Sequence, residues 1–83
     1  MAFTRRKIKT TETLGEILLR SRRKNKISLE QAEESTKIRQ KYLKAIERDD
    51  WNTFSSRVYT LGFVRRYSDF LGLDGKSLIE DHK

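Results

Sequence analysis

Residues 28–48, SLEQAEESTKIRQKYLKAIER, contain two short helix patterns separated by a tight turn. The capping box Ser28-Leu29-Glu30-Gln31 opens the first helix, over about residues 29–35. The turn is Thr36-Lys37-Ile38, and a second helix follows over residues 39–48. The side chains of this second helix that helical spacing directs inward are Tyr42, Leu43 and Ile46. Two short helices joined by a three-residue turn predict a helix-turn-helix.

A further helix is predicted before this unit. Thr13 and Glu16 form a second capping box, which begins a helix over residues 13–24. Asn25-Lys26 ends that helix, since Asn tolerates the left-handed backbone conformation. Residues 1–12 show no apolar period and are predicted to be a flexible basic arm.

Two more helices are predicted after this unit. Residues 49–56 form a turn-rich connection whose Trp51 and Phe54 we expect to be anchored in the core. The helices beyond it are predicted over residues 57–71, stopped by Gly72, and from Asp74 to near His82. The pattern therefore predicts an all-α, five-helix bundle in a single domain over residues 13–83.

Composition excludes several classes of protein. The chain has no cysteine, so disulfides and thiolate metal sites are excluded. Its longest uncharged stretches, such as residues 58–64, are far shorter than the roughly 20 apolar residues of a membrane span. The basic start is followed by no apolar run, so it is not a secretory signal. We therefore expect a cytoplasmic location.

The net charge of +7 is concentrated at one end of the chain. Residues 1–26 hold nine Lys or Arg residues and only two acidic ones, whereas residues 27–83 are neutral as a whole. A concentrated basic segment attracts polyanions, either nucleic acid or an anionic membrane surface. A solvated tail that keeps the protein soluble is the alternative interpretation.

The predicted helix over residues 57–71 has two apolar sides. One side, expected to face the core, contains Val58, Leu61, Val64, Ser68 and Leu71. The other side is aromatic and contains Tyr59, Phe63, Tyr67 and Phe70, with Arg66 beside them. Neighbouring segments can cover this second side, or a partner can bind it; we expect Tyr59 and Phe63 to be exposed. Gly62 is expected to permit a close helix approach.

Several segments resemble one known family. They are Leu14–Glu16, Ile27–Glu30, Thr36–Arg39, Lys41–Glu47, Asp50-Trp51, Val58–Tyr67 and Phe70–Asp74. Together they are similar to the N-terminal cytoplasmic helix-turn-helix domain of RodZ-like bacterial cell-shape proteins, within the Xre/Cro-like superfamily. The most specific part is Val-Tyr-x-x-Gly-Phe-x-Arg-x-Tyr at residues 58–67. The resemblance implies a lambda-repressor/Xre-like bundle.

The same resemblance implies a partner and a site. Domains of this family bind the actin-like filament protein MreB through aromatic residues of the fourth helix, which by position are Tyr59 and Phe63 here. Arg66 and Tyr67 complete the expected partner-binding set. The resemblance also implies that the membrane is reached only through a transmembrane segment that this chain lacks.

Two residues depart from the family pattern. Ser55-Ser56 stands where the family has a proline before the fourth helix, although Ser56 is still able to cap that helix. Glu33 stands where a small residue is usual, and we expect it to be partly exposed or paired with a Lys or Arg.

DNA binding is the alternative function. A helix-turn-helix lays its second helix in the major groove, where Gln reads adenine and Arg or Lys reads guanine. The residues expected to face DNA are Arg39, Gln40, Lys41 and Lys44, with Arg48 near the backbone. Leu29, where such repressors often have a phosphate-binding Gln, and Ala45, placed on the groove side, count against sequence-specific reading.

Catalytic chemistry is not indicated. His82 is the single histidine and lies at the C-terminal end, and the adjacent pairs Asp49-Asp50 and Glu33-Glu34 point in different directions on a helix. The four glycines form no phosphate-binding loop. We therefore predict a non-enzymatic binding module with no metal and no cofactor.

Overall fold

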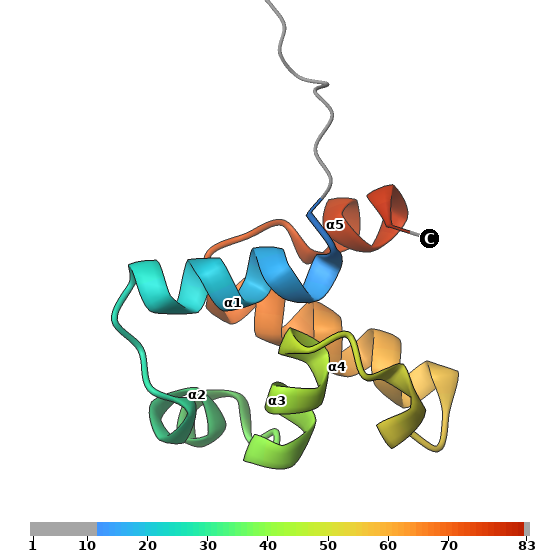
Figure 1. Ribbon diagram of the computed structural model, residues 1–83, viewed down its shortest axis with the longest axis horizontal. Helices are drawn as coiled ribbons and strands as arrows, with labels where there is room; N and C mark the ends of the chain where they lie inside the picture. Colours follow the sequence, from blue (N-terminus) through green and yellow to red (C-terminus); the bar gives the residue numbers. More distant parts are fainter. Residues whose placement is uncertain (1–11, 83) are drawn as a thin grey trace, which may run out of the picture.

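The computed structural model describes residues 12–82, which form five α-helices in the predicted order (Figure 1). They are α1 (Leu14–Lys24), α2 (Leu29–Thr36), α3 (Gln40–Glu47), α4 (Arg57–Phe70) and α5 (Gly75–Asp81), with a short 3-10 helix η2 (Trp51–Thr53) after α3. The predicted all-α helix-turn-helix bundle is therefore confirmed. The predictions made for residues 1–11, including most of the basic arm, lie outside the described residues.

The predicted caps form at four of the five helices. Thr13 with Glu16 and Ser28 with Gln31 make complete capping boxes at α1 and α2. Ser56 and Asp74 accept backbone hydrogen bonds at the starts of α4 and α5. Each of these side chains satisfies a backbone N–H that has no partner within its helix.

Left-handed backbone conformations fix the turns between helices. Gly72 ends α4 with φ 83°, as predicted. The left-handed residue after α1 is Lys26, with φ 57°, whereas Asn25 stays at φ −90°. The prediction that Asn25 takes that role is wrong: its side-chain amide donates to the Ser21 carbonyl instead. Lys37, at φ 63°, forms the turn between α2 and α3.

One buried cluster joins the first four helices. Its members are Leu18, Ala32, Ile38, Leu43, Ile46, Val64, Tyr67 and Leu71. Helix α3 packs against both α1 and α2, while α4 packs against α2 and α5 (Figure 1). The inward positions predicted for Leu43 and Ile46 are confirmed, because both side chains are fully buried.

The start of α1 is held by a residue that follows the C-terminal end of α3. Asp49 accepts a hydrogen bond from the Gly15 N–H at 3.0 Å and another from the Thr13 hydroxyl. A Cβ added at Gly15 would lie 2.3 Å from the carbonyl oxygen of Ile46, so only glycine permits this contact. The close approach predicted at Gly62 is wrong, since a Cβ there would meet nothing within 4 Å.

Two properties of residues 12–82 bear on function. No helix in this range combines the length and the apolar character needed to cross a bilayer. Nor does this range hold a group of three or more His, Cys, Asp or Glu side chains placed to bind a metal ion.

Candidate partner-binding surface

Five aromatic rings from three elements form one continuous cluster on the surface. Phe54 lies 5.4 Å from Tyr42 and 6.1 Å from Phe63, measured between ring centroids. Trp51 adjoins Phe54 at 6.3 Å, and Tyr59 stacks on Phe63 at 6.4 Å. Spacings of this size are typical of favourable ring contacts. We call these five residues the aromatic surface.

The two ends of the aromatic surface face solvent. Tyr59 is 63% exposed and Trp51 37% exposed, whereas the three rings between them are half-buried. A shallow hollow of about 250 Å³ lies over the cluster and is lined by Tyr42, Phe54, Tyr59, Phe63 and Ser55. The exposure predicted for Tyr59 is confirmed, whereas Phe63 is only half-exposed.

The first half of α4 is exposed on both of its apolar sides. Val58 is 76% exposed and Leu61 37% exposed, so the prediction that both face the core is wrong. Val64, Ser68 and Leu71, further along the same side, are buried as predicted. Helical spacing defines a side of a helix but not how far the neighbouring helices extend along it.

Arg66 lies beside the aromatic residues but is partly engaged. Its side chain donates a hydrogen bond from Nη1 to the Thr36 carbonyl at 3.2 Å, which joins α4 to the end of α2. The residue remains exposed, so its guanidinium has further donors for a partner.

Tyr67 does not belong to the surface. Its side chain is fully buried, and its hydroxyl donates a hydrogen bond to the Glu47 carboxylate. The same carboxylate accepts from Arg22 Nε at 2.6 Å and from Arg22 Nη2 at 3.0 Å. The prediction that Tyr67 contacts a partner is therefore wrong. The Tyr67 ring lies in the interior because the buried Glu47 carboxylate on α3 accepts the hydrogen bond of its hydroxyl.

The α3 residues considered for DNA binding have different surroundings. Arg39, Lys41, Lys44 and Arg48 are exposed, and Lys41 Nζ lies 5.1 Å from the centre of the Tyr42 ring. Gln40 instead donates a hydrogen bond from its side-chain amide to the Glu33 carboxylate at 3.0 Å. The amide that would contact a base is therefore already engaged within the domain. Glu33 is half-buried, as expected, but its bond here is to an amide rather than to a cation. Ala45, expected on the groove side, is only 5% exposed and packs inward.

The sequence analysis assigns three members of the aromatic surface, Tyr42, Trp51 and Phe54, to the core and not to a binding site. Tyr42 and Phe54 do pack against the core while half-buried, whereas Trp51, on η2, is 37% exposed, so its expected core position is wrong. The polar run around them, Asp49-Asp50 and Ser55-Ser56, was the available signal, because such residues mark a surface connection.

Comparison with known proteins identifies the class. Residues 17–78 match the helix-turn-helix domain family, and the chain belongs to it. A solved structure of YmfM from Staphylococcus aureus, described as a candidate DNA-binding membrane protein, superposes with a TM-score of 0.82 at 28% identity. The superposition covers 86% of this chain and 87% of that one.

Two curated relatives narrow the class. The uncharacterized membrane protein YmfM of Bacillus subtilis is 33% identical over 57 residues, which are 69% of this chain and 20% of that protein. The cytoskeleton protein RodZ of Streptococcus pneumoniae is 30% identical over 69 residues, which are 83% of this chain and 25% of that protein. The chain thus spans a quarter or less of these relatives. The predicted resemblance to RodZ-like helix-turn-helix domains is confirmed.

Proposed function

We propose that this chain is a cytoskeletal docking module that binds an MreB-like actin homologue through the aromatic surface. The observation that carries the proposal is the exposure of Tyr59, at 63%, on a ring cluster whose three central rings are half-buried. Large aromatic side chains that are held rigidly at a surface are the residues that dominate protein interfaces. The RodZ relative is named a cytoskeleton protein, which agrees with such a partner.

The proposed contact set differs from the sequence prediction. It retains Tyr59, Phe63 and Arg66, loses the buried Tyr67, and gains the rest of the aromatic surface. Tyr59 contributes the most accessible ring of the aromatic surface, and the half-buried Phe63 ring stacks against it. Arg66 lies on the same helix as Tyr59 and Phe63, so a partner surface that combines apolar and acidic groups is complementary.

We place this module at the cytoplasmic face of a membrane. Both YmfM relatives are named as membrane proteins, and this chain matches only a minor part of the Bacillus subtilis protein. A filament-binding domain held at the membrane would tether the filament to it.

The test is co-sedimentation with polymerised filaments. Tyr59→Ala removes an exposed ring, so it should leave the fold intact and weaken binding by more than about 1 kcal/mol, a factor of roughly five. Val58→Ala is the matched control, because it truncates a neighbouring exposed residue on the other side of α4 and should bind like wild type. Equal binding by all three proteins would refute docking on this surface.

DNA binding is a second candidate function, favoured by the four exposed cations on and directly flanking α3 and by the description of the Staphylococcus aureus structure. Lys41→Glu with Lys44→Glu should abolish any DNA retardation in a gel at low salt while leaving filament binding intact. Absence of a shift with the wild-type domain under the same conditions would dispose of this candidate.

A further inference from the structure

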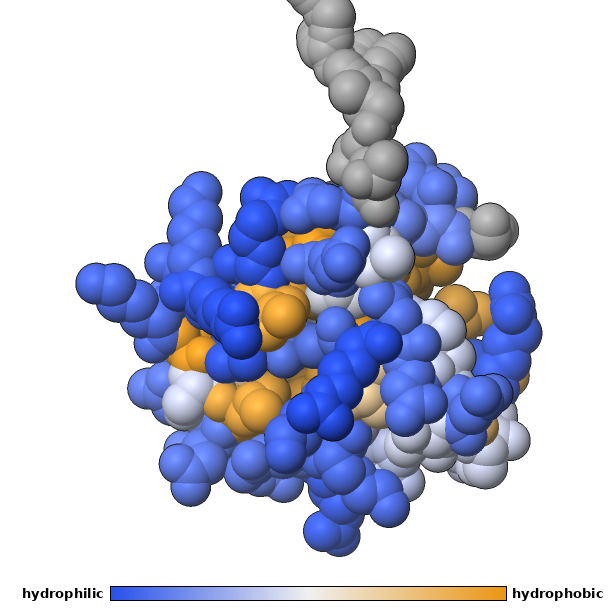
Figure 2. All heavy atoms as spheres, in the orientation of Figure 1, coloured by the Kyte–Doolittle hydropathy of each residue, from blue (hydrophilic) through white to orange (hydrophobic). Residues whose placement is uncertain are grey.

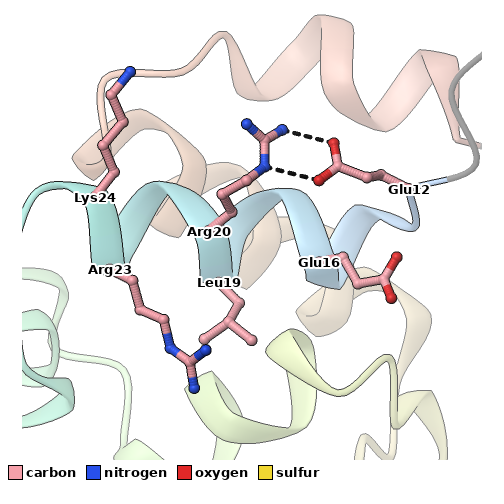
Figure 3. Close-up of a pocket in the computed structure, with 6 residues that line it drawn as sticks. All are labelled: Glu12, Glu16, Leu19, Arg20, Arg23 and Lys24. Carbon is pink, nitrogen blue, oxygen red and sulfur yellow. Dashed lines mark hydrogen bonds and ion pairs between the residues drawn. The ribbon is translucent and has the colours of Figure 1, made fainter.

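A hollow on the outward side of α1 is lined by three cations (Arg20, Arg23 and Lys24), two carboxylates (Glu12 and Glu16) and Leu19 (Figure 3). Arg20 and Lys24 project from one side of the helix, and Leu19 and Arg23 project from the other. Arg20 is paired with Glu12 at 2.6 Å, although its side chain remains 64% exposed. Leu19 is half-buried and projects on the same side of α1 as Arg23. These residues line one shallow hollow on the surface.

The uncompensated charge lies at the C-terminal end of α1. Arg23, Lys24 and Lys26 are exposed and have no hydrogen bond from a side chain and no ion pair within residues 12–82. Arg22, in the same turn, is different because it turns inward to the buried Glu47. At this end of α1, three exposed cations therefore have no acidic partner among residues 12–82.

This surface is separate from both surfaces discussed above. In Figure 1, α1 lies along the upper side of the bundle, whereas α2 and the start of α3 lie at its lower side. DNA held by α3 would therefore not reach the outer side of α1. Figure 2 shows the face of the molecule that is turned to the viewer in Figure 1. This face is mostly hydrophilic, with small hydrophobic areas between the long polar side chains. Cations around a partly exposed aliphatic group are the composition of a membrane-interface surface.

We propose that the outward side of α1 lies against an anionic phospholipid surface. Arg23 and Lys24 pair with lipid phosphates there and Lys26 adds charge, while the half-buried Leu19 lies on the Arg23 side of the contact. A broad convex helix side fits a flat, laterally mobile array of phosphates. The inference uses the membrane location proposed above, but it does not require filament binding.

The test is flotation of the full chain with phosphatidylcholine vesicles that either contain or lack phosphatidylglycerol. Wild type should float only with the anionic vesicles and should be released at high ionic strength. Arg23→Glu with Lys24→Glu should weaken binding about thirtyfold or more, because each basic residue near such a surface contributes roughly a fivefold attraction. The charge-matched control, Lys41→Glu with Lys44→Glu on α3, should float like wild type.

The variants are checked for folding by thermal melting, because cations in the last turn also stabilise a helix end. Arg23→Gln with Lys24→Gln is the milder second variant, and it should lose part of the binding with a native melting curve. Equal loss in the α1 and α3 variants would overturn the proposal, as would no flotation of wild type. Binding of duplex DNA that only the α1 variant loses, without flotation of wild type, would make this a nucleic-acid surface instead. Tyr59→Ala should still float, which separates this test from that of filament docking.

Discussion

Tyr67 on α4 and Glu47 on α3 are joined by a buried hydrogen bond, in which the phenol donates to the carboxylate. Glu47 is also paired with Arg22 on α1, so one carboxylate connects three helices. The Arg22 and Glu47 side chains are only 14% and 5% exposed. Hydrogen bonding to Glu47 raises the pKa of Arg22, so this cation keeps its charge. Arg22 also donates to the Ile27 carbonyl at 2.9 Å, which fixes the loop that leads into α2.

Removing Arg22 should destabilise the domain strongly. Arg22→Met would leave the Glu47 carboxylate buried without its cation, which typically costs about 3–5 kcal/mol. Arg23→Met is the control, since Arg23 is exposed one residue later and its loss should change stability by less than about 0.5 kcal/mol. Urea unfolding measures both values. Equal stability of the two variants would contradict the structural importance of the buried pair.

Alkaline pH should weaken the fold through Tyr67. Burial, followed by the hydrogen bond to Glu47, raises the pKa of Tyr67 far above its ordinary value of 10.0. The unfolded chain therefore releases this proton near pH 10 while the folded chain keeps it. The stabilisation that protonated Tyr67 gives the folded state is complete below that pH and is lost as the pH rises above it. The free energy of unfolding falls by about 1.4 kcal/mol at a pH of about 11.

Tyr67→Phe isolates this effect, because the variant lacks the titrating group while other tyrosines and lysines titrate in both proteins. The difference in unfolding free energy between wild type and variant should shrink by about 1.4 kcal/mol between a pH of about 9 and about 11. Parallel pH profiles for the two proteins would show that Tyr67 ionises with equal ease in both states.

Two glycines should respond in opposite directions to the same substitution. Gly15→Ala would place a methyl group 2.3 Å from the Ile46 carbonyl and 2.8 Å from Asp49, so we expect a loss of roughly 1–3 kcal/mol. Gly62→Ala meets open space within α4 and should stabilise the helix by about 0.5–1 kcal/mol. Thermal melting compares the two variants directly, and a stabilised Gly15→Ala would refute the close packing of α1 on α3.

Local rules were sufficient to predict the helices. Capping residues such as Thr13 and Ser28 act on backbone groups three residues away, so the sequence alone contains the necessary information. The same holds for Gly72, whose positive φ ends α4. Five helices and the helix-turn-helix could therefore be predicted.

Contacts between distant residues were beyond local reasoning. The partners of Glu47 are 25 and 20 residues away, and Asp49 accepts a hydrogen bond from Gly15, 34 residues earlier, at the start of α1. Helical spacing put Tyr67 beside Tyr59 and Phe63, but the fate of each ring depends on which helix lies opposite it. The aromatic surface was accordingly predicted only in part.

A pair of leucine truncations should separate the packed part of the bundle from the exposed part of α4. Leu43 is fully buried, so Leu43→Ala should cost about 2–5 kcal/mol, enough to unfold much of so small a domain. Leu61 is 37% exposed, and Leu61→Ala should cost less than about 1 kcal/mol. Chemical denaturation of both variants gives the comparison. If Leu61→Ala were as costly as Leu43→Ala, the first half of α4 would be packed into the core in solution. Tyr59, on the same turns of the helix, would then lose the exposed setting on which filament docking depends.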